Sequence, residues 1–139
     1  MAGTKSGFSA EERAAMKERA KELKAATTKA EAEKDVLAKI AELPGDDRAM
    51  AKRLHELIKS SFPDLDAKTW YGSPAYSKDG KMICFFQSAS KFNTRYTTLG
   101  FSDDAQLDDG NFWPTSYAIT KLGPADEKAI VALITKAVG

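Results

Sequence analysis

The spacing of hydrophobic residues changes twice along the chain. Up to about residue 62 apolar side chains recur every three or four positions, as in helices, and from Ala67 they alternate or cluster as in strands. Helical spacing returns after Gly123-Pro124. Because helices and strands come in groups, the pattern predicts an α+β domain with a mainly antiparallel sheet of about five strands. Two to three helices precede this sheet and one follows it.

The first predicted helix runs from Ser9 to Ala26, with Ser9 and Glu12 spaced as a capping box. Its apolar stripe is thin and consists of Met16, Ala20 and Leu23. We therefore expect residues 1–26 to form an extension with a loosely docked helix, its first seven residues frayed, and residues 27–139 to form a single domain. The alternative is that this stripe contacts a partner or a second copy of the chain in a homodimer.

Two more helices are predicted before the sheet. Thr28 opens the capping pattern "TKAE", and Pro44-Gly45 ends the helix that follows it. Asp46 is placed to cap a third helix, which runs to about Ser61. His55 lies beside the apolar face of this helix. A lone histidine there is expected to be a satisfied boundary residue, because a metal site needs several converging ligands.

A hairpin is predicted around Asp79-Gly80, between "PAYSK" and "KMICFFQ". Pairing of Lys78 with Lys81 would divide the hairpin into two faces. One face would pack on the helices and carry Ala75, Met82, Cys84 and Phe86. The other would mix apolar bulk with hydrogen-bonding groups and carry Pro74, Tyr76, Ile83, Phe85 and Gln87.

The remaining elements follow from the same patterns. A strand is predicted from Thr94 to Phe101, and another in "TSYAITKL". After Gly123-Pro124 a final helix places apolar residues on one side, namely Ile130, Leu133, Ile134 and Ala137.

Aromatic and polar residues around the hairpin form the candidate binding site. They either build a second small core or contact surface, or they line a ligand cleft with a few polar groups. The candidate ligand-binding residues are Trp70, Tyr71, Tyr76, Phe85, Gln87, Lys91, Arg95 and Trp113.

Composition narrows the class of protein. Lysines and arginines number 21 against 20 acidic residues, so the net charge of +1 gives no general attraction for nucleic acid or anionic lipid. No apolar run is long enough for a signal peptide or a membrane span, which makes the cytoplasm the expected location. The single cysteine excludes an internal disulfide.

No catalytic or metal-binding constellation is predicted. Cys84 and His55 could form a nucleophile and base, but a thiol in the middle of a core-facing strand tends to stay protonated. An acidic run offers a weak alternative for a metal, yet it lacks the ligand spacing of a calcium-binding loop. This run consists of Asp103, Asp104, Asp108 and Asp109. We therefore expect a protein that is not an enzyme and holds no cofactor.

The segment "TWYGSPAYSKDGKMICFFQSASKFNTRYTTLGF" resembles the signature of the YdhG-like family, domain of unknown function family 1801. The resemblance covers about Glu33 to Val138. It implies an antiparallel sheet with helices packed against it and a relation to the frataxin neighbourhood, in which some members are labelled intracellular iron chaperones. It defines no catalytic residues.

Two hypotheses for function follow. The first is a small cytoplasmic domain that is not an enzyme and binds a small ligand or a protein through the aromatic-lined face of its sheet. The alternative is an iron-handling chaperone that uses the acidic residues, with iron as its cofactor.

Overall fold

The computed structural model describes residues 9–139, except for the side chains of residues 25 and 26. The predicted fraying of the first seven residues lies outside this range. The described chain divides into two units, and the division falls between Glu31 and Ala32. Within the described residues, no helix is both long and apolar enough to cross a membrane.

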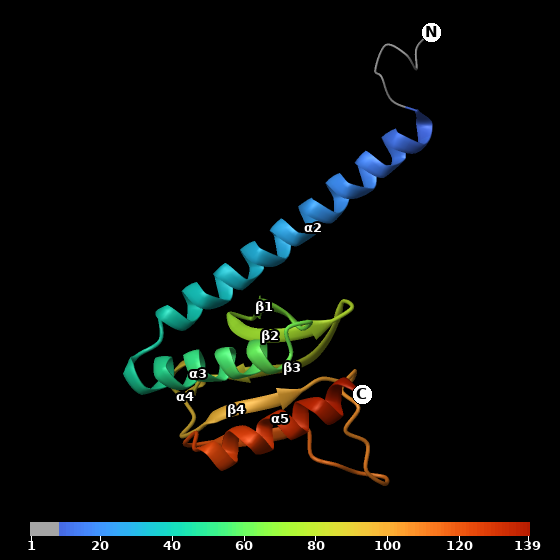
Figure 1. Ribbon diagram of the computed structural model, residues 1–139. Coiled ribbons are helices and arrows are strands. Elements are labelled where there is room, and N and C mark those ends of the chain that lie inside the picture. Colours follow the sequence, from blue (N-terminus) through green and yellow to red (C-terminus); the bar gives the residue numbers. More distant parts are fainter. Residues whose placement is uncertain (1–8) are drawn as a thin grey trace. The chain divides into compact units, whose positions relative to one another are not determined.

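One helix, α2, replaces the two that were predicted before Pro44. It runs from Ala10 to Ala41 (Figure 1). The predicted cap at Ser9 is confirmed, since the Glu12 amide donates to Ser9 Oγ at 3.1 Å. The predicted break at Thr28 is wrong. The Thr28 hydroxyl donates to the Lys24 carbonyl at 2.9 Å, so it is satisfied inside the helix, and no glycine or proline nearby interrupts the chain.

The second helix, α3 (Gly45–Ser61), begins two residues earlier than predicted. Pro44 occupies its N-cap position, so Asp46 lies in the first turn and does not cap the helix. Asp47, next to it, accepts a hydrogen bond from the Ser90 amide at 2.8 Å. This bond joins the start of α3 to the short helix α4 (Ala89–Phe92).

Five strands form one antiparallel sheet in the order β1-β2-β3-β4-β5, so each strand pairs with its neighbour in the sequence. This confirms the predicted α+β class. The strands are β1 (Asp66–Trp70), β2 (Ser73–Lys78), β3 (Lys81–Gln87), β4 (Thr97–Phe101) and β5 (Ser116–Ile119). The expected strand from Thr94 begins only at Thr97, because α4 and the turn after it occupy the preceding residues.

Two-residue turns join the first three strands. Asp79 and Gly80 both have positive φ, 51° and 80°, which confirms the predicted turn. Tyr71 and Gly72 form the other turn with φ of 49° and 72°. Such turns match the twist of the paired strands.

The core lies on one face of the sheet. α3 and the last helix, α5 (Pro124–Val138), both pack against that face (Figure 1). From α5, three of the four predicted core residues are buried, namely Ile130, Ile134 and Ala137, and Leu133 is partly buried. Val36 and Ile40 of α2 complete this core within residues 32–139.

The predicted core positions of Cys84 and Phe86 in β3 are confirmed, but the predicted faces of Tyr76 and Ala75 in β2 are wrong. Lys78 pairs with Lys81 and Ser77 with Met82, as expected, but Tyr76 then pairs with Cys84. Ile83 is left without a partner, as in a β-bulge, and an extra residue in one strand shifts the register of all pairs beyond it. Tyr76 therefore shares the core face with Cys84, and Ala75 pairs with Phe85 on the other face.

Candidate functional site

Three of the predicted site residues form an aromatic cluster on the sheet face away from the helices. The Trp70 ring lies 4.8 Å from the Phe85 ring and 4.9 Å from the Tyr71 ring, centroid to centroid. Phe85 pairs with Gly100 of β4, where a Cβ would collide with the Phe85 ring. Tyr71 is 81% exposed, so the cluster reaches solvent at the β1–β2 turn.

Tyr76 does not belong to this cluster. It is fully buried in the core, and its hydroxyl lies 2.8 Å from Nδ1 of His55. On the other side of the imidazole, Nε2 lies 3.2 Å from Oε1 of Glu33. This arrangement suits a neutral ring in which Nε2 donates to the carboxylate and Nδ1 accepts from Tyr76. His55 is thus a satisfied core histidine, as predicted, but it is buried and does not lie at the boundary.

The other predicted site residues lie apart from the aromatic cluster. The Arg95 guanidinium sits 5.6 Å from the centre of the Tyr96 ring. Trp113 is partly buried against the hydrophobic core. Gln87 pairs with Thr98 at the end of β3. No described contact joins these three to Trp70 or Phe85, and their binding roles stay predictions.

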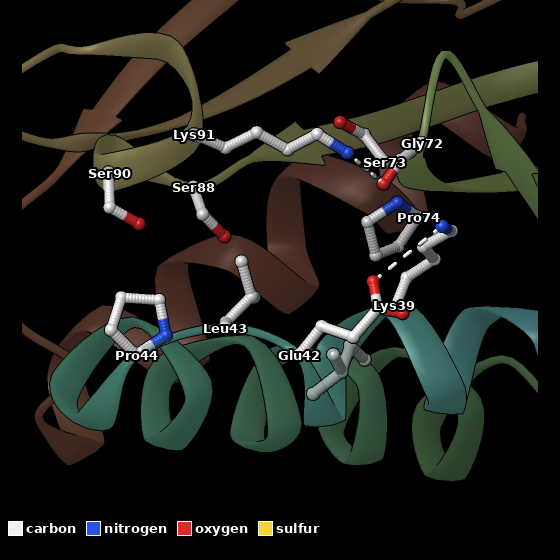
Figure 2. Close-up of a pocket in the computed structure, with 11 residues that line it drawn as sticks. Lys39, Glu42, Leu43, Pro44, Gly72, Ser73, Pro74, Ser88, Ser90 and Lys91 are labelled. Atoms are coloured by element: carbon white, nitrogen blue, oxygen red, sulfur yellow. Dashed lines mark hydrogen bonds and ion pairs between the residues drawn. The ribbon is translucent and has the colours of Figure 1, made fainter.

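Lys91 instead lies at a cavity of about 390 Å³ (Figure 2). We call it the Gly72 cavity, after the turn that forms one wall. Its lining comes from the end of α2 and the start of α3, from the β1–β2 turn, and from the segment around α4: Lys39, Ile40, Glu42, Leu43, Pro44, Gly72, Ser73, Pro74, Ser88, Ser90 and Lys91. All of these residues belong to the unit 32–139.

The turn holds the end of Lys91 at the cavity wall. Lys91 Nζ donates to the Gly72 carbonyl at 2.6 Å. A Cβ at Gly72 would collide with the same Nζ, and the φ of 72° at this position already disfavours other residues. Gly72 is therefore needed both for the turn and for the close approach of the lysine.

Ser73, next to Gly72, carries a buried hydroxyl. The residue is 2% exposed, and its Oγ has no hydrogen-bond partner among the described residues. Buried hydroxyl groups are nearly always hydrogen-bonded, so an unpaired one needs an explanation. The pairing of Ser73 with Trp70 places this hydroxyl on the sheet face that carries the aromatic cluster.

The opposite wall is more apolar. Leu43 rises from the end of the helix toward Ser88, and Pro44 and Pro74 flank it (Figure 2). The Lys39 ammonium and the Glu42 carboxylate lie 3.6 Å apart, but their side chains are 47% and 68% exposed, so solvent screens this pair.

The candidate nucleophile and metal ligands are placed elsewhere. Burial raises the pKa of Cys84 to about 12, so its thiol stays protonated in the core. In the part of the chain that the structure describes, no group of three or more His, Cys, Asp or Glu side chains is placed to hold a metal ion. That statement includes the acidic loop with Asp103, Asp104, Asp108 and Asp109.

Sequence reasoning found Lys91 but missed the rest of the cavity. Ser73 and Ser88 carry no local signal of a binding role, since serine is common in turns. The one available signal was Gly72, whose place before Pro74 predicts a sharp bend or a close backbone approach. Comparison of the chain with known protein families, curated proteins and solved structures finds no match. The resemblance to the YdhG-like family therefore stays a prediction.

Proposed function

We propose that this chain is a binding domain, not an enzyme, and that it takes a small molecule in the Gly72 cavity. The observation that carries the proposal is a cavity of about 390 Å³ whose wall holds Lys91 Nζ on the Gly72 carbonyl at 2.6 Å. Ligand sites commonly have volumes of about 300–1,000 Å³ and combine apolar walls with a few fixed polar groups. The Gly72 cavity has that size and that mixture.

A role in binding fits the cavity better than catalysis does. The lining holds no His, Cys or Tyr among the described residues. The two groups with acid, base or nucleophilic chemistry in the core, His55 and Cys84, lie outside the lining, and His55 already has partners on both ring nitrogens. The aromatic cluster of Trp70, Tyr71 and Phe85 stays a predicted contact surface, and no described acidic cluster favours the iron-handling alternative.

The test is a ligand-observed NMR screen of small acids, alcohols and amines against the full chain. We expect at least one compound to bind and to be recovered chemically unchanged. The Leu43→Trp variant, in which the new ring fills the cavity, should no longer bind it. Leu133→Trp is the matched control, since Leu133 is also partly buried but does not line the cavity. Ser90→Trp fills the same space from an exposed position, which covers the case that Leu43→Trp does not fold.

The proposal is wrong if no compound binds, or if binding survives in both cavity-filling variants. Conversion of a bound compound to product, with loss of turnover in Leu43→Trp, would show an enzyme instead.

A further inference from the structure

We propose that two copies of this chain pair antiparallel along β5 and thereby join their sheets into one. The proposal goes beyond binding in the Gly72 cavity and does not depend on it. In the described sheet β5 is an edge strand, because β4 is its only neighbour in the strand order. An edge strand presents unpaired main-chain groups to which another strand can bind.

The free main-chain groups of β5 belong to Ser116 and Ala118. The Phe101 amide donates to the Thr115 carbonyl at 2.8 Å. Since every second residue of an antiparallel pair is hydrogen-bonded to the partner strand, Tyr117 also bonds to β4. The amides and carbonyls of Ser116 and Ala118 then point away from β4, and both residues are exposed. Two copies can therefore exchange hydrogen bonds through these two residues.

The two edges of the sheet differ in their protection. β1, the other edge, carries the charged residues Asp66 and Lys68, and charged side chains on an edge strand disfavour pairing with another strand. From Ser116 to Ile119, β5 has neither a charged residue nor a proline. The edge at β5 is therefore the more open of the two to a second strand.

The charges at the two ends of β5 favour a second copy as the partner. Lys121 lies just beyond the end of the strand and is exposed. Asp103 and Asp104, also exposed, follow Phe101, whose bond to Thr115 places them near the start of the strand. When two identical strands pair antiparallel, the end of each lies beside the start of the other. Each basic end then meets the acidic end of the other copy.

A cavity of about 240 Å³ beside β5 adds an apolar contact. It lies between this strand and α5, and its lining includes Tyr117, Ala129 and Leu133. Asp126 also lines it, but its carboxylate accepts a hydrogen bond from the Gly123 amide at 2.8 Å. A two-fold axis perpendicular to the sheet keeps the helices of both copies on one face, so both cavities adjoin the seam. Pairing then removes apolar surface from water as well as forming hydrogen bonds.

Analytical ultracentrifugation of the full chain measures the association. We expect the mass to rise to that of a dimer between about 5 µM and about 500 µM chain. Ala118→Lys should abolish the dimer, because it places like charges close together across the seam. Ala132→Lys is the matched control, since it adds the same charge at an exposed position of α5 outside the cavity lining and should change nothing.

A second pair of variants tests the charges at the ends of the strand. Lys121→Glu should weaken the dimer about tenfold, because attraction becomes repulsion at both ends of the seam. Lys128→Glu makes the same change at an exposed position of α5 and should leave the affinity as it is.

Hydrogen exchange of the unchanged chain locates the contact and covers the case that a variant does not fold. The amides of Ser116 and Ala118 should exchange more slowly as the chain concentration rises, while those of β1 should not change. A chain that stays monomeric at the highest concentration would overturn the proposal. A dimer without this protection would overturn it as well and would point to the stripe of Met16, Ala20 and Leu23 instead.

Discussion

The Tyr76 hydroxyl lies 2.8 Å from His55 Nδ1 in the core, where both side chains are buried. This hydrogen bond joins the centre of β2 to α3. The same imidazole also contacts Glu33, which belongs to the part of α2 within residues 32–139. Three elements are thus joined through one ring. Polar groups in a core stabilise a fold only while each keeps its partner.

Tyr76→Phe should therefore destabilise the domain. The substitution keeps the ring but leaves a buried histidine nitrogen without its donor, which costs about 1–3 kcal/mol in the free energy of unfolding. Urea denaturation followed by circular dichroism measures this change. Tyr117→Phe is the control, because that ring is only partly buried, and its effect should stay within about 0.5 kcal/mol. Equal stabilities of the Tyr76→Phe variant and the original chain would contradict a structural role for the hydroxyl.

Stability should fall in mild acid. Burial lowers the pKa of His55 below its ordinary value of 6.5, although the neighbouring Glu33 carboxylate raises it. Below about pH 6.5 the unfolded chain then binds a proton that the folded chain resists, so the free energy of unfolding decreases as the pH falls through the folded pKa. Above about pH 6.5 this contribution is fully present.

The pKa itself can be read directly, because His55 is the only histidine and its ring protons give isolated NMR signals. We expect a midpoint below 6.5, and a lower one in Glu33→Gln, which removes the carboxylate that raises the pKa. A midpoint at or above 6.5 would mean that burial does not outweigh the Glu33 carboxylate.

Cys84 should react slowly with a thiol reagent until the protein unfolds. Its side chain is buried and its pKa is raised to about 12, so little thiolate forms and the reagent has no access. The modification rate at about pH 8, measured with and without urea, tests this. Cys84→Ser should cost about 1–3 kcal/mol if the hydroxyl finds no partner, and more than Cys84→Ala. Rapid modification of the folded protein would reopen a role as a reactive thiol.

Deletion of residues 1–26 should leave a folded domain. Every described side chain of α2 from Ala10 to Glu31 is exposed, and the first buried side chain of this helix is Val36. Cooperative unfolding of the shortened chain would agree with this. Deletion through Ile40 is the control, since it removes two buried side chains that contribute about 1.5–3 kcal/mol each. If the chain without residues 1–26 has a smaller molecular mass in solution than the loss of these residues explains, α2 is a contact between copies of the chain.

Much of the fold could be predicted because it depends on local patterns. Asp79-Gly80 determines its turn through two positive φ angles that few other pairs adopt. The grouping of helices and strands predicted the fold class, and the apolar spacing in α5 predicted its buried side. Each of these depends on residues close together in the sequence.

The candidate site depended on contacts that the sequence does not encode locally. Lys91 and Gly72 are 19 residues apart, and only the packing of α4 beside the β1–β2 turn brings them together. The face of Tyr76 was mispredicted because one bulged residue, Ile83, reverses the alternation of every pair beyond it. Periodicity thus predicted most of the helices and strands, but it missed the continuity of α2 through Thr28 and the short helix α4. The tertiary structure decided which side chains meet, because a one-residue shift in register or a single long-range hydrogen bond changes no local pattern.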